Sequence, residues 1–216
     1  MTNSFWESVH KVKYDGQDWT KKPSIFVQEA IESLPKHGLV LELGAGQGQD
    51  SIFFRKRNYE VISSDNELSI IERADQNAHE YFNGSYGPMR FQLIDISNIF
   101  PLDSNFVDVV YAHLSLHYFD YEVTKQVFSE IYRVLKPGGV LAFLVNSTND
   151  PEFNTGVKLE DHFFETSGTK KRYFSINDAL GFTKEFEVIL CDDKGETYKD
   201  SAKGVHNLIR FIGRKP

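Results

Sequence analysis

A glycine-rich loop that directly follows a short apolar run constrains the fold of this 216-residue chain more than any other stretch. Residues 39–43 are Leu-Val-Leu-Glu-Leu, long enough for a buried parallel strand and too short for a helix. Gly44, Gly46 and Gly48 follow at alternate positions, where glycine permits a sharp turn and lets a ligand approach bare backbone. A helical pattern begins near Gln49, so the loop leads into a helix N-terminus with its free N–H groups. Strand, loop and helix predict the first half of a βαβ nucleotide-binding unit.

The spacing of the small residues indicates which ligand the loop suits. A dinucleotide fingerprint, Gly-x-Gly-x-x-Gly, places its third small residue at position 49, where this chain has glutamine. Glu42 stands beside the loop, and its carboxylate suits a cationic ligand and opposes a pyrophosphate. An isolated Gly-x-Gly favours a tight turn without a ligand, whereas Glu42 and the motifs further along favour a binding site.

Two motifs resemble those of one enzyme superfamily. Residues 42–48, Glu-Leu-Gly-Ala-Gly-Gln-Gly, resemble motif I of the class I S-adenosylmethionine-dependent methyltransferases. Residues 133–141, Arg-Val-Leu-Lys-Pro-Gly-Gly-Val-Leu, are similar to the helix–turn–fifth-strand signature of the same superfamily. In physical terms the second motif predicts a helix closed by a glycine C-cap and a proline stop before a buried strand. The resemblance covers residues 38–146 and implies S-adenosyl-L-methionine as the cofactor and S-adenosyl-L-homocysteine as the product.

The resemblance also implies an α/β fold, a doubly wound, Rossmann-like sheet of seven strands in the order 3-2-1-4-5-7-6 with the last strand antiparallel. The patterns of apolar residues predict helices over 25–34, 52–57, 68–81, 123–135 and 175–182, and strands over 39–43, 59–64, 89–94, 106–111, 186–190 and 205–212. We expect one methyltransferase domain over 1–216, comprising an N-terminal lid and helix (1–37), a cofactor-binding core (38–146), a substrate-side insertion (147–174) and a C-terminal helix and hairpin (175–216).

The acidic residues at predicted strand ends are candidates for cofactor binding. Asp65 lies about 20 residues after the glycine loop, where an acid accepts hydrogen bonds from ribose hydroxyls in βαβ nucleotide sites. A strand-end aspartate on its own is usually a turn residue or helix cap, but the loop upstream favours the ribose role. By resemblance Asn66 borders the adenine, Asp95 accepts from its amino group and the Ile96 N–H meets a ring nitrogen, although Asp95 equally suits a turn cap. The predicted cofactor-binding residues are Trp19, Glu42, Leu43, Gly44, Ala45, Gly46, Asp65, Asn66, Asp95, Ile96, Ala112, His113 and Leu114.

Residues 112–119 contain the candidate catalytic groups. They leave the predicted fourth strand at the switch point, where ligands bind in doubly wound sheets. By resemblance the first three line the cofactor, and His117 and Tyr118 lie near the methyl group. Histidine ordinarily titrates near neutrality, so His117 is the candidate general base. The alternatives are a histidine that orders the loop, or catalysis that depends mainly on alignment of the acceptor with the sulfonium. His113 and His117 lack a third ligand, so we predict no metal site.

Charge and composition bear on the partners. A net charge of −7 argues against a broad nucleic-acid surface, which is basic. No Asn/Asp-Pro-Pro-Tyr/Phe motif is present, and the single cysteine, Cys191, is not preceded by proline, so nucleobase methylation is disfavoured. No apolar run approaches the roughly 18 residues of a membrane span, no signal peptide is recognised, and one cysteine fits a reducing cytoplasm. We therefore expect a cytoplasmic protein with a small-molecule acceptor, without nucleic-acid or membrane partners; the oligomeric state is left open.

Two segments outside the motifs are candidates for acceptor binding. Residues 1–22 contain both tryptophans, which suit packing anchors or a lid over the site. Residues 151–174 have a loop-like pattern rich in aromatic residues, which predicts a pocket wall or flap, or alternatively a short β insertion.

Taken as a whole, the chain loosely resembles the small methyltransferases that include the tellurite-resistance and thiopurine enzymes. The leading hypothesis is in-line methyl transfer to a small molecule. The alternatives are a protein methyltransferase, a non-catalytic cofactor-binding or sensing module with the same fold, and an NAD-dependent oxidoreductase, which Gln49 opposes.

Overall fold

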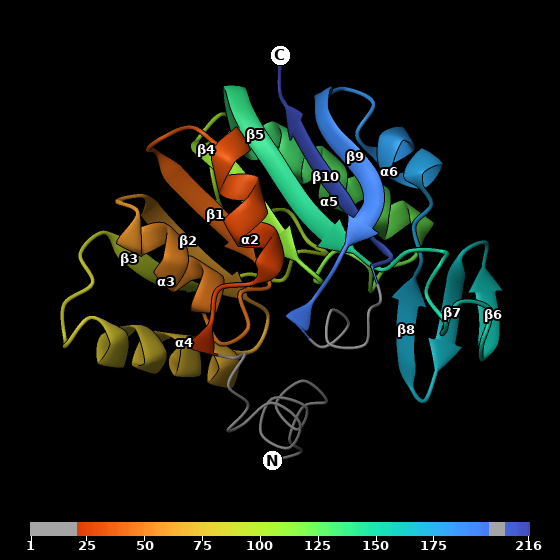
Figure 1. The fold of residues 1–216 in the computed structure, drawn as a ribbon, viewed down its shortest axis with the longest axis horizontal. Helices are drawn as coiled ribbons and strands as arrows, with labels where there is room; N and C mark the ends of the chain where they lie inside the picture. Colours follow the sequence, from red (N-terminus) through yellow and green to blue (C-terminus); the bar gives the residue numbers. More distant parts are fainter. Residues whose placement is uncertain (1–20, 199–205) are drawn as a thin grey trace.

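A seven-stranded sheet forms the centre of the protein, in a computed structural model that describes residues 21–198 and 206–216 (Figure 1). In spatial order its strands are β3 (Met89–Leu93), β2 (Glu60–Asp65), β1 (Leu39–Leu43), β4 (Val107–His113), β5 (Leu135–Val145), β10 (Leu208–Arg214) and β9 (Glu187–Gly195). The first five are parallel to one another, whereas β10 runs antiparallel to both of its neighbours. The predicted order 3-2-1-4-5-7-6 and the antiparallel last strand are confirmed, with β10 as strand seven and β9 as strand six.

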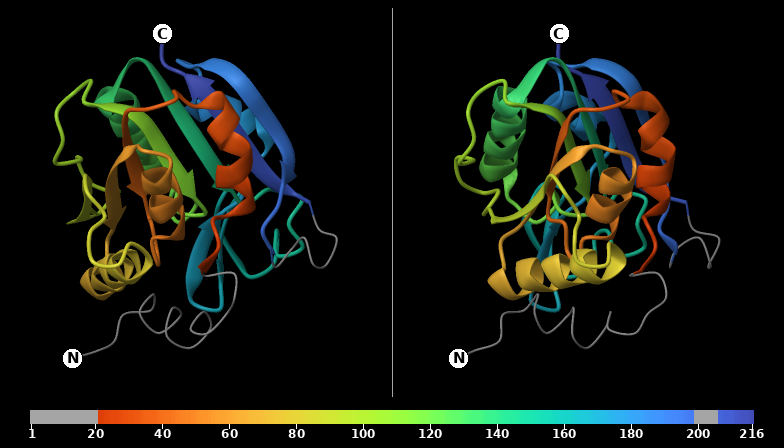
Figure 2. Two further views of the ribbon diagram at one scale, coloured as in Figure 1. Left: turned by 60° about the vertical axis from the view of Figure 1, so that its left-hand side comes forward. Right: turned by 90° about the vertical axis from the view of Figure 1, so that its left-hand side faces the viewer.

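Helices cover both faces of the sheet (Figures 1 and 2). One face carries α2 (Ile25–Ala30), the 3-10 turn η3 (Ile31–Ser33), α3 (Gln49–Lys56) and α4 (Leu68–Tyr81), and the other carries α5 (Tyr121–Val134) and α6 (Ile176–Phe182). Each face has its own apolar core, built around Phe26, Phe54 and Tyr111 on one side and Phe128 and Phe143 on the other. Because the central strands are buried on both faces, their sequences are nearly continuous apolar runs.

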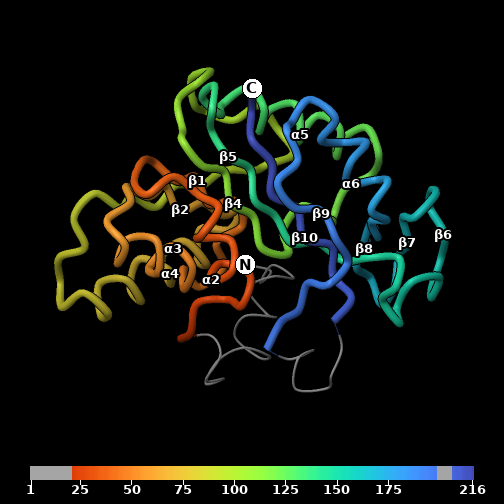
Figure 3. The backbone as a smooth tube through the Cα atoms, turned by 45° about the horizontal axis from the view of Figure 1, so that its top comes forward, coloured from red at the N-terminus to blue at the C-terminus, as the bar shows by residue number. Residues whose placement is uncertain are grey.

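The order in which strands are added to the sheet reverses between β3 and β4, and this reversal fixes the position of the site. From β1 the chain runs outward to β3 and then returns to β4, on the other side of β1 (Figure 3). The carboxyl ends of β1 and β4 therefore diverge at a switch point, and the loops that follow them border a crevice.

A second sheet of three antiparallel strands lies near the carboxyl end of β5 (Figure 1). Its strands are β6 (Val157–Glu160), β7 (Phe163–Thr166) and β8 (Thr169–Arg172). The prediction of a loop over residues 151–174 is thus wrong, and its alternative, a short β insertion, is correct. Ser167 and Gly168 both have positive φ, as the two central residues of a tight hairpin turn require. The Ser-Gly pair was therefore the local signal for a hairpin.

The end of α5 differs from the predicted glycine cap. The helix stops at Val134, and Leu135 is already extended, with φ −69° and ψ 136°. Pro137 disfavours the helical conformation for the residue before it, so the chain passes directly into β5. Gly138 has φ 78° but lies inside β5, where its N–H donates to the carbonyl of Lys215 over 2.8 Å. The glycine serves the strand and not the helix terminus.

A buried lysine takes the place of the predicted glycine cap. The ammonium of Lys215 donates to the carbonyl oxygens of Tyr132 over 2.8 Å and Leu135 over 2.7 Å, and to Asn105 Oδ1 over 2.9 Å. It also lies 4.4 Å from the centroid of the Tyr132 ring. Since carbonyls at a helix C-terminus lack partners within the helix, the lysine charge both pairs them and complements the helix dipole.

Replacing this lysine tests its role in stability. In Lys215→Met the apolar stem is retained, but the carbonyls of Tyr132 and Leu135 lose their donor within a buried site, and each such loss costs about 1–3 kcal/mol. We expect urea denaturation to show a loss of about 2–4 kcal/mol in the free energy of unfolding. Lys184→Met, at an exposed position, is the matched control. A loss as small as that of the control contradicts the capping role.

Candidate active site

The glycine loop is held against the segment that follows β4. Gly44 has φ 72°, and a Cβ on it would lie 2.4 Å from Ser115 Cβ, so only glycine fits. Ser115 Oγ donates to the carbonyl of Leu43 over 2.6 Å and closes the contact from the other side. The two loops at the switch point therefore touch, and the glycine backbone faces the space between them.

Asp65 is fixed at the end of β2 by backbone donors. Gly46 N–H donates to its Oδ2 over 3.1 Å and Asn66 N–H to its Oδ1 over 2.9 Å. Burial raises the pKa of Asp65, and the hydrogen bonds from Gly46, Asn66 and Glu67 oppose that rise. Because the Gly46 bond joins the carboxylate to the glycine loop, the predicted ribose-binding acid and the predicted motif I form one unit.

A cavity of about 390 Å³ lies where these elements meet, at the carboxyl ends of β1 and β4. Its volume is in the range of small-molecule sites, which run from about 300 to 1,000 Å³. Eleven residues of the predicted site line it, namely Glu42, Gly44, Ala45, Gly46, Asp65, Asn66, Asp95, Ile96, His113, Leu114 and Tyr118. Seven further residues, none of them in the predicted site, also line it, namely Gln47, Gln49, Asp50, Ile70, Ile94, Ser115 and Phe119.

Three described residues of the predicted site are not among those that line the cavity. Leu43, Ala112 and His117 are buried in the protein interior. Leu43 and Ala112 both contribute to the core on the α5 side. Trp19 lies outside the described residues. The roles assigned to these four remain predictions.

His117, the candidate general base, has an unfavourable environment for that role. Burial, followed by the charges of Lys171 and His113, lowers its pKa to about 3. Its Nδ1 has no hydrogen-bond partner among the described residues, while its backbone carbonyl accepts from the Arg172 N–H over 2.7 Å. A base this weak takes up little proton at neutral pH. The segment is thus held at His117 through the backbone, and both the general-base role and the loop-ordering role of the imidazole remain predictions.

Asp50 is the main residue that sequence reasoning missed. Its carboxylate accepts from Ser24 N–H and Ser24 Oγ, both over 2.7 Å, and from Tyr111 Oη over 2.8 Å. Ser24 Oγ also caps α2 by accepting from Val27 N–H over 3.1 Å. Asp50 thus joins α2, α3 and β4 at the cavity wall. An acid in the first turn of a helix was visible in the sequence, but its partners, 26 and 61 residues away, were not.

Glu42 lies in the same wall. Its Oε2 accepts a short hydrogen bond from Ser51 Oγ. Burial, and after it the charge of Asp50, raises the pKa of Glu42 well above its usual range, although the Ser51 hydrogen bond acts in the opposite direction. A cation bound in the cavity would relieve the repulsion between these two groups.

Asp95 caps a turn, as one of its two predicted roles requires, and it lies at the cavity. It is exposed, its Oδ1 accepts from Ser97 N–H over 3.0 Å and Ser97 Oγ over 2.7 Å, and its Oδ2 accepts from Asn98 Nδ2 over 2.9 Å. It therefore caps a turn, and it also lines the cavity beside Ile96. Contact with an adenine remains a prediction.

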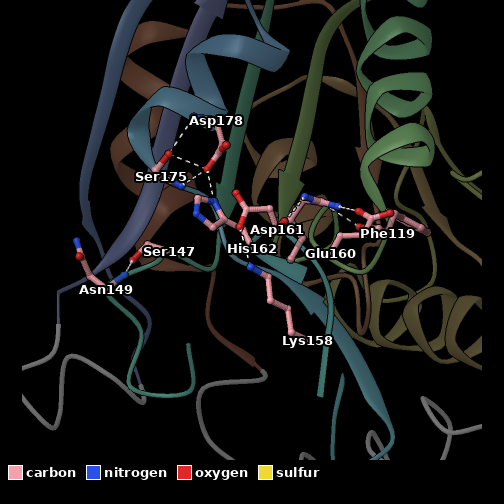
Figure 4. A network of polar contacts seen from close by, with 10 residues as sticks. Phe119, Ser147, Asn149, Lys158, Glu160, Asp161, His162, Ser175 and Asp178 are labelled. Carbon is pink, nitrogen blue, oxygen red and sulfur yellow. Dashed lines mark hydrogen bonds and ion pairs between the residues drawn. The ribbon is translucent and has the colours of Figure 1, made fainter. Parts of the chain in front are cut away.

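The three-stranded sheet is attached to the cavity segment through Arg172, which is 5% exposed. Its guanidinium donates to Glu160 Oε2 over 2.6 Å and to the carbonyl of Phe119 over 3.1 Å. Figure 4 shows Glu160 close to Phe119, and His162 facing Asp178, whose Oδ2 lies 2.9 Å from His162 Nδ1. The sheet is thereby fixed both to the segment after β4 and to the start of α6.

The buried neutral state of His117 predicts a pH dependence of stability. Below about pH 6.5 an unfolded histidine binds a proton that folded His117 excludes until about pH 3. The free energy of unfolding therefore falls as the pH is lowered through this window, by about 1.4 kcal/mol per unit. Between pH 7 and pH 5 we expect the wild type to lose about 2 kcal/mol more than His117→Gln in urea denaturation. His37→Gln controls for removal of an exposed imidazole, and equal losses in wild type and His117→Gln contradict the prediction.

Comparison with known proteins adds independent information on the family. A family model described as "Methyltransferase domain" matches residues 41–143, from β1 to β5. A putative methyltransferase YqeM of Bacillus subtilis is 33% identical over 54% of this chain and 45% of its own length. A malonyl-[acyl-carrier protein] O-methyltransferase of Salmonella typhimurium is 34% identical over 48% of this chain and 37% of its own length. The matched stretch thus spans less than half the length of these curated relatives.

Solved structures agree on the fold. A SAM-dependent methyltransferase of Methanosarcina mazei superposes with a TM-score of 0.71 at 19% identity and covers 85% of this chain and 95% of its own. The family model and the relatives describe methyltransferases and not NAD-dependent oxidoreductases, and the fold agrees with them. The motifs at residues 42–48 and 133–141 agree as well. The chain therefore belongs to the class I S-adenosylmethionine-dependent methyltransferase superfamily, and its cofactor is S-adenosyl-L-methionine.

Proposed function

We propose that the protein is an enzyme of the class 2.1.1 that transfers the methyl group of S-adenosylmethionine, in line, to a small-molecule acceptor. The observation that carries this proposal is the cavity at the switch point, which combines the glycine loop with Tyr118 and Phe119. A wall that joins cofactor-type residues to aromatic rings suits a site for two ligands, one of them an organic molecule.

The residues of the cavity fit the cofactor chemically. A Cβ on Gly44 would meet Ser115, so glycine lets the two loops that border the cavity come together with the loop backbone left bare. One polar atom of the lining, His113 Nε2, is buried without a hydrogen-bond partner among the described residues, as expected of an atom whose partner is a ligand. The carboxylate of Glu42 complements the ammonium of the cofactor.

We assign the cofactor contacts as follows. Asp65 accepts from the ribose hydroxyls, Asn66, Asp95 and Ile96 surround the adenine, and Glu42 balances the ammonium beside Gly44. The bound cofactor supplies a methyl group made electrophilic by its sulfonium. The protein then contributes mainly position: it holds an acceptor against that methyl group and excludes water, and such alignment alone accounts for a large share of a bimolecular barrier.

The segment boundaries extend this proposal to the rest of the chain. Residues 38–146 would serve as the cofactor half, 147–174 as the acceptor half, and 175–216 as support for the sheet.

A protein acceptor is the second candidate, since the related Salmonella enzyme carries the name of an acyl-carrier-protein methyltransferase. A non-catalytic module would bind the cofactor without turnover. Among the described helices, none has the length and apolarity needed to cross a membrane.

Removing the Asp65 carboxylate tests the assigned cofactor contacts. A charge-assisted hydrogen bond to the ribose contributes about 1.5–3 kcal/mol, which corresponds to a roughly ten- to hundredfold change in affinity. We expect Asp65→Ala to weaken S-adenosylmethionine and S-adenosylhomocysteine by this factor in calorimetric titration, and both by the same factor because both carry the ribose.

Asp103→Ala is the matched control, because Asp103 is exposed in the turn before β4, at the amino end of that strand. Unchanged affinity in Asp65→Ala overturns the ribose assignment. Absence of binding by the wild type overturns the proposed function.

The environment of Glu42 predicts proton release on cofactor binding. Burial and the neighbouring Asp50 raise the pKa of Glu42, so the free protein keeps this carboxyl protonated over a wider pH range than usual. A bound ammonium favours the ionised form and lowers that pKa, so binding releases a proton and the affinity rises as the pH rises through this range. Calorimetric titration of S-adenosylhomocysteine in two buffers with different ionisation enthalpies measures the release. We expect Glu42→Gln to abolish it and Glu185→Gln, an exposed control, to retain it; proton uptake by the wild type contradicts the assignment.

A further inference from the structure

The wall of the cavity is strongly acidic. Glu42 and Asp50 are each 2% exposed and Asp65 is 9% exposed, and all three line the space. Within residues 21–198 and 206–216, no lysine or arginine lines it. Asp50 accepts three hydrogen bonds and donates none, as an ionised carboxylate does. The cofactor contacts proposed above use Glu42 and Asp65, so the negative charge of Asp50 is left for a second ligand.

The unpaired polar atoms of the lining indicate what that ligand carries. Gln49 Oε1 is buried without a partner in the described structure, and an amide oxygen only accepts, so it requires a donor. Burial lowers the pKa of His113, although the charge of Asp50 acts against this, and the imidazole adds no positive charge to the wall. A ligand with N–H donors and a positive charge satisfies both Gln49 and Asp50.

Two cations of residues 147–174, Lys171 and Arg172, are already paired. Lys171 binds Glu152 Oε2 over 2.6 Å. Arg172 binds Glu160 Oε2 over 2.6 Å, and its other donors bind the carbonyls of Phe119 and Asp161. Lys21 and Lys22 are exposed, and neither lines the cavity. A carboxylate acceptor would therefore enter an acidic cavity without a cation from the described residues to balance it, which carries a high desolvation cost.

The three common acceptor chemistries can be compared on this basis. A carboxylate oxygen is repelled by the wall. A hydroxyl must lose a proton as it attacks, but His117 lies outside the lining and has a pKa of about 3. An amine in its free-base form carries a lone pair that is ready to attack, and it needs no base in the site.

We infer that the methyl acceptor is a small amine and that Asp50, with Gln49, binds its positively charged forms; this inference rests on the proposed methyltransferase function. The ammonium form gives one proton to water, and the nitrogen lone pair then forms the new N–C bond as the C–S bond breaks and leaves its electron pair on sulfur. The positive charge passes from sulfur to nitrogen, so the carboxylates stabilise a cation throughout. Tyr118 and Phe119 line the same cavity, and aromatic rings attract an ammonium as well.

A binding experiment tests the charge preference without turnover. Protein saturated with S-adenosylhomocysteine is titrated in a calorimeter, near neutral pH, with benzylamine, benzyl alcohol and benzoate, which share a skeleton and differ in charge. We expect benzylamine, charged in solution, to bind at least about tenfold more tightly than benzyl alcohol, as a charge-assisted hydrogen bond predicts, and benzoate to bind most weakly.

Two variants locate the source of this preference. Asp50→Asn keeps the shape of the side chain and removes its charge, and we expect it to reduce the preference for benzylamine to about threefold or less. Gln49→Ala is the second variant, in case loss of the Ser24 and Tyr111 contacts prevents Asp50→Asn from folding; it removes the acceptor oxygen for the ammonium and should also reduce the preference. Glu185→Gln, with the same change of charge as Asp50→Asn at an exposed position, should retain it. Benzoate binding as tightly as benzylamine, no preference for benzylamine, or a preference unchanged in both variants overturns the inference.

A labelling experiment separates failure of this inference from failure of the proposed function. The wild type is incubated with trideuteromethyl S-adenosylmethionine and a defined mixture of small amines, alcohols and carboxylates, and the products are identified by mass spectrometry. Label on nitrogen supports the inference. Label on oxygen overturns it and leaves the methyltransferase function intact. Absence of label on any acceptor, with cofactor binding intact, overturns the proposed function and the inference with it.

Discussion

The site depends on one close approach, that of Gly44 to Ser115. Strands β1 and β4 are neighbours, and the loops after them lead to opposite sides of the crevice. The two loops touch at one point, where a Cβ on Gly44 would lie 2.4 Å from Ser115 Cβ. Ser115 is turned toward β1 by Leu114, which has φ 57°, an uncommon conformation for leucine. Because Ser115 Oγ also binds the Leu43 carbonyl, the floor of the cavity is bare backbone held from both sides. Any side chain at position 44 would therefore push the two loops apart.

Asp50 adds an electrostatic consequence to this geometry. A buried carboxylate is costly unless it is hydrogen-bonded, and three donors from Ser24 and Tyr111 offset that cost. The same bonds fasten α2 to α3 and β4, so the residue that joins three elements also makes the cavity wall negative. The fold thus already holds in place, for structural reasons, the carboxylate that the proposed amine acceptor would use.

The features that the sequence predicted are those encoded within a few residues. The glycine loop, the acid at the end of β2 and the helix with bounds Leu68–Tyr81 all have local signatures, and all are present. The features it missed depend on contacts between distant residues: Asp50 with Ser24 and Tyr111, and Lys215 with the end of α5, 80 residues away in the case of Leu135. The three-stranded sheet was predicted only as the alternative, because its strands have 4 residues each and β6 is exposed along its whole length, so no buried face marks it.

His117 illustrates why chemistry alone did not locate the acceptor side. The sequence favours it because histidine titrates near neutrality, but the backbone decides which side chains of the segment after β4 face the cavity. Arg172 binds the His117 carbonyl through its N–H and the Phe119 carbonyl through its guanidinium, and in that arrangement Ser115, Tyr118 and Phe119 line the space while His117 is buried. Arg172 ends β8, which lies beyond the residues that match the family model. In the proposed function, the insertion would therefore set which side chains the acceptor meets, although it contributes no residue to the lining of the cavity. A change of acceptor would then require a change in the insertion or in the residues it holds.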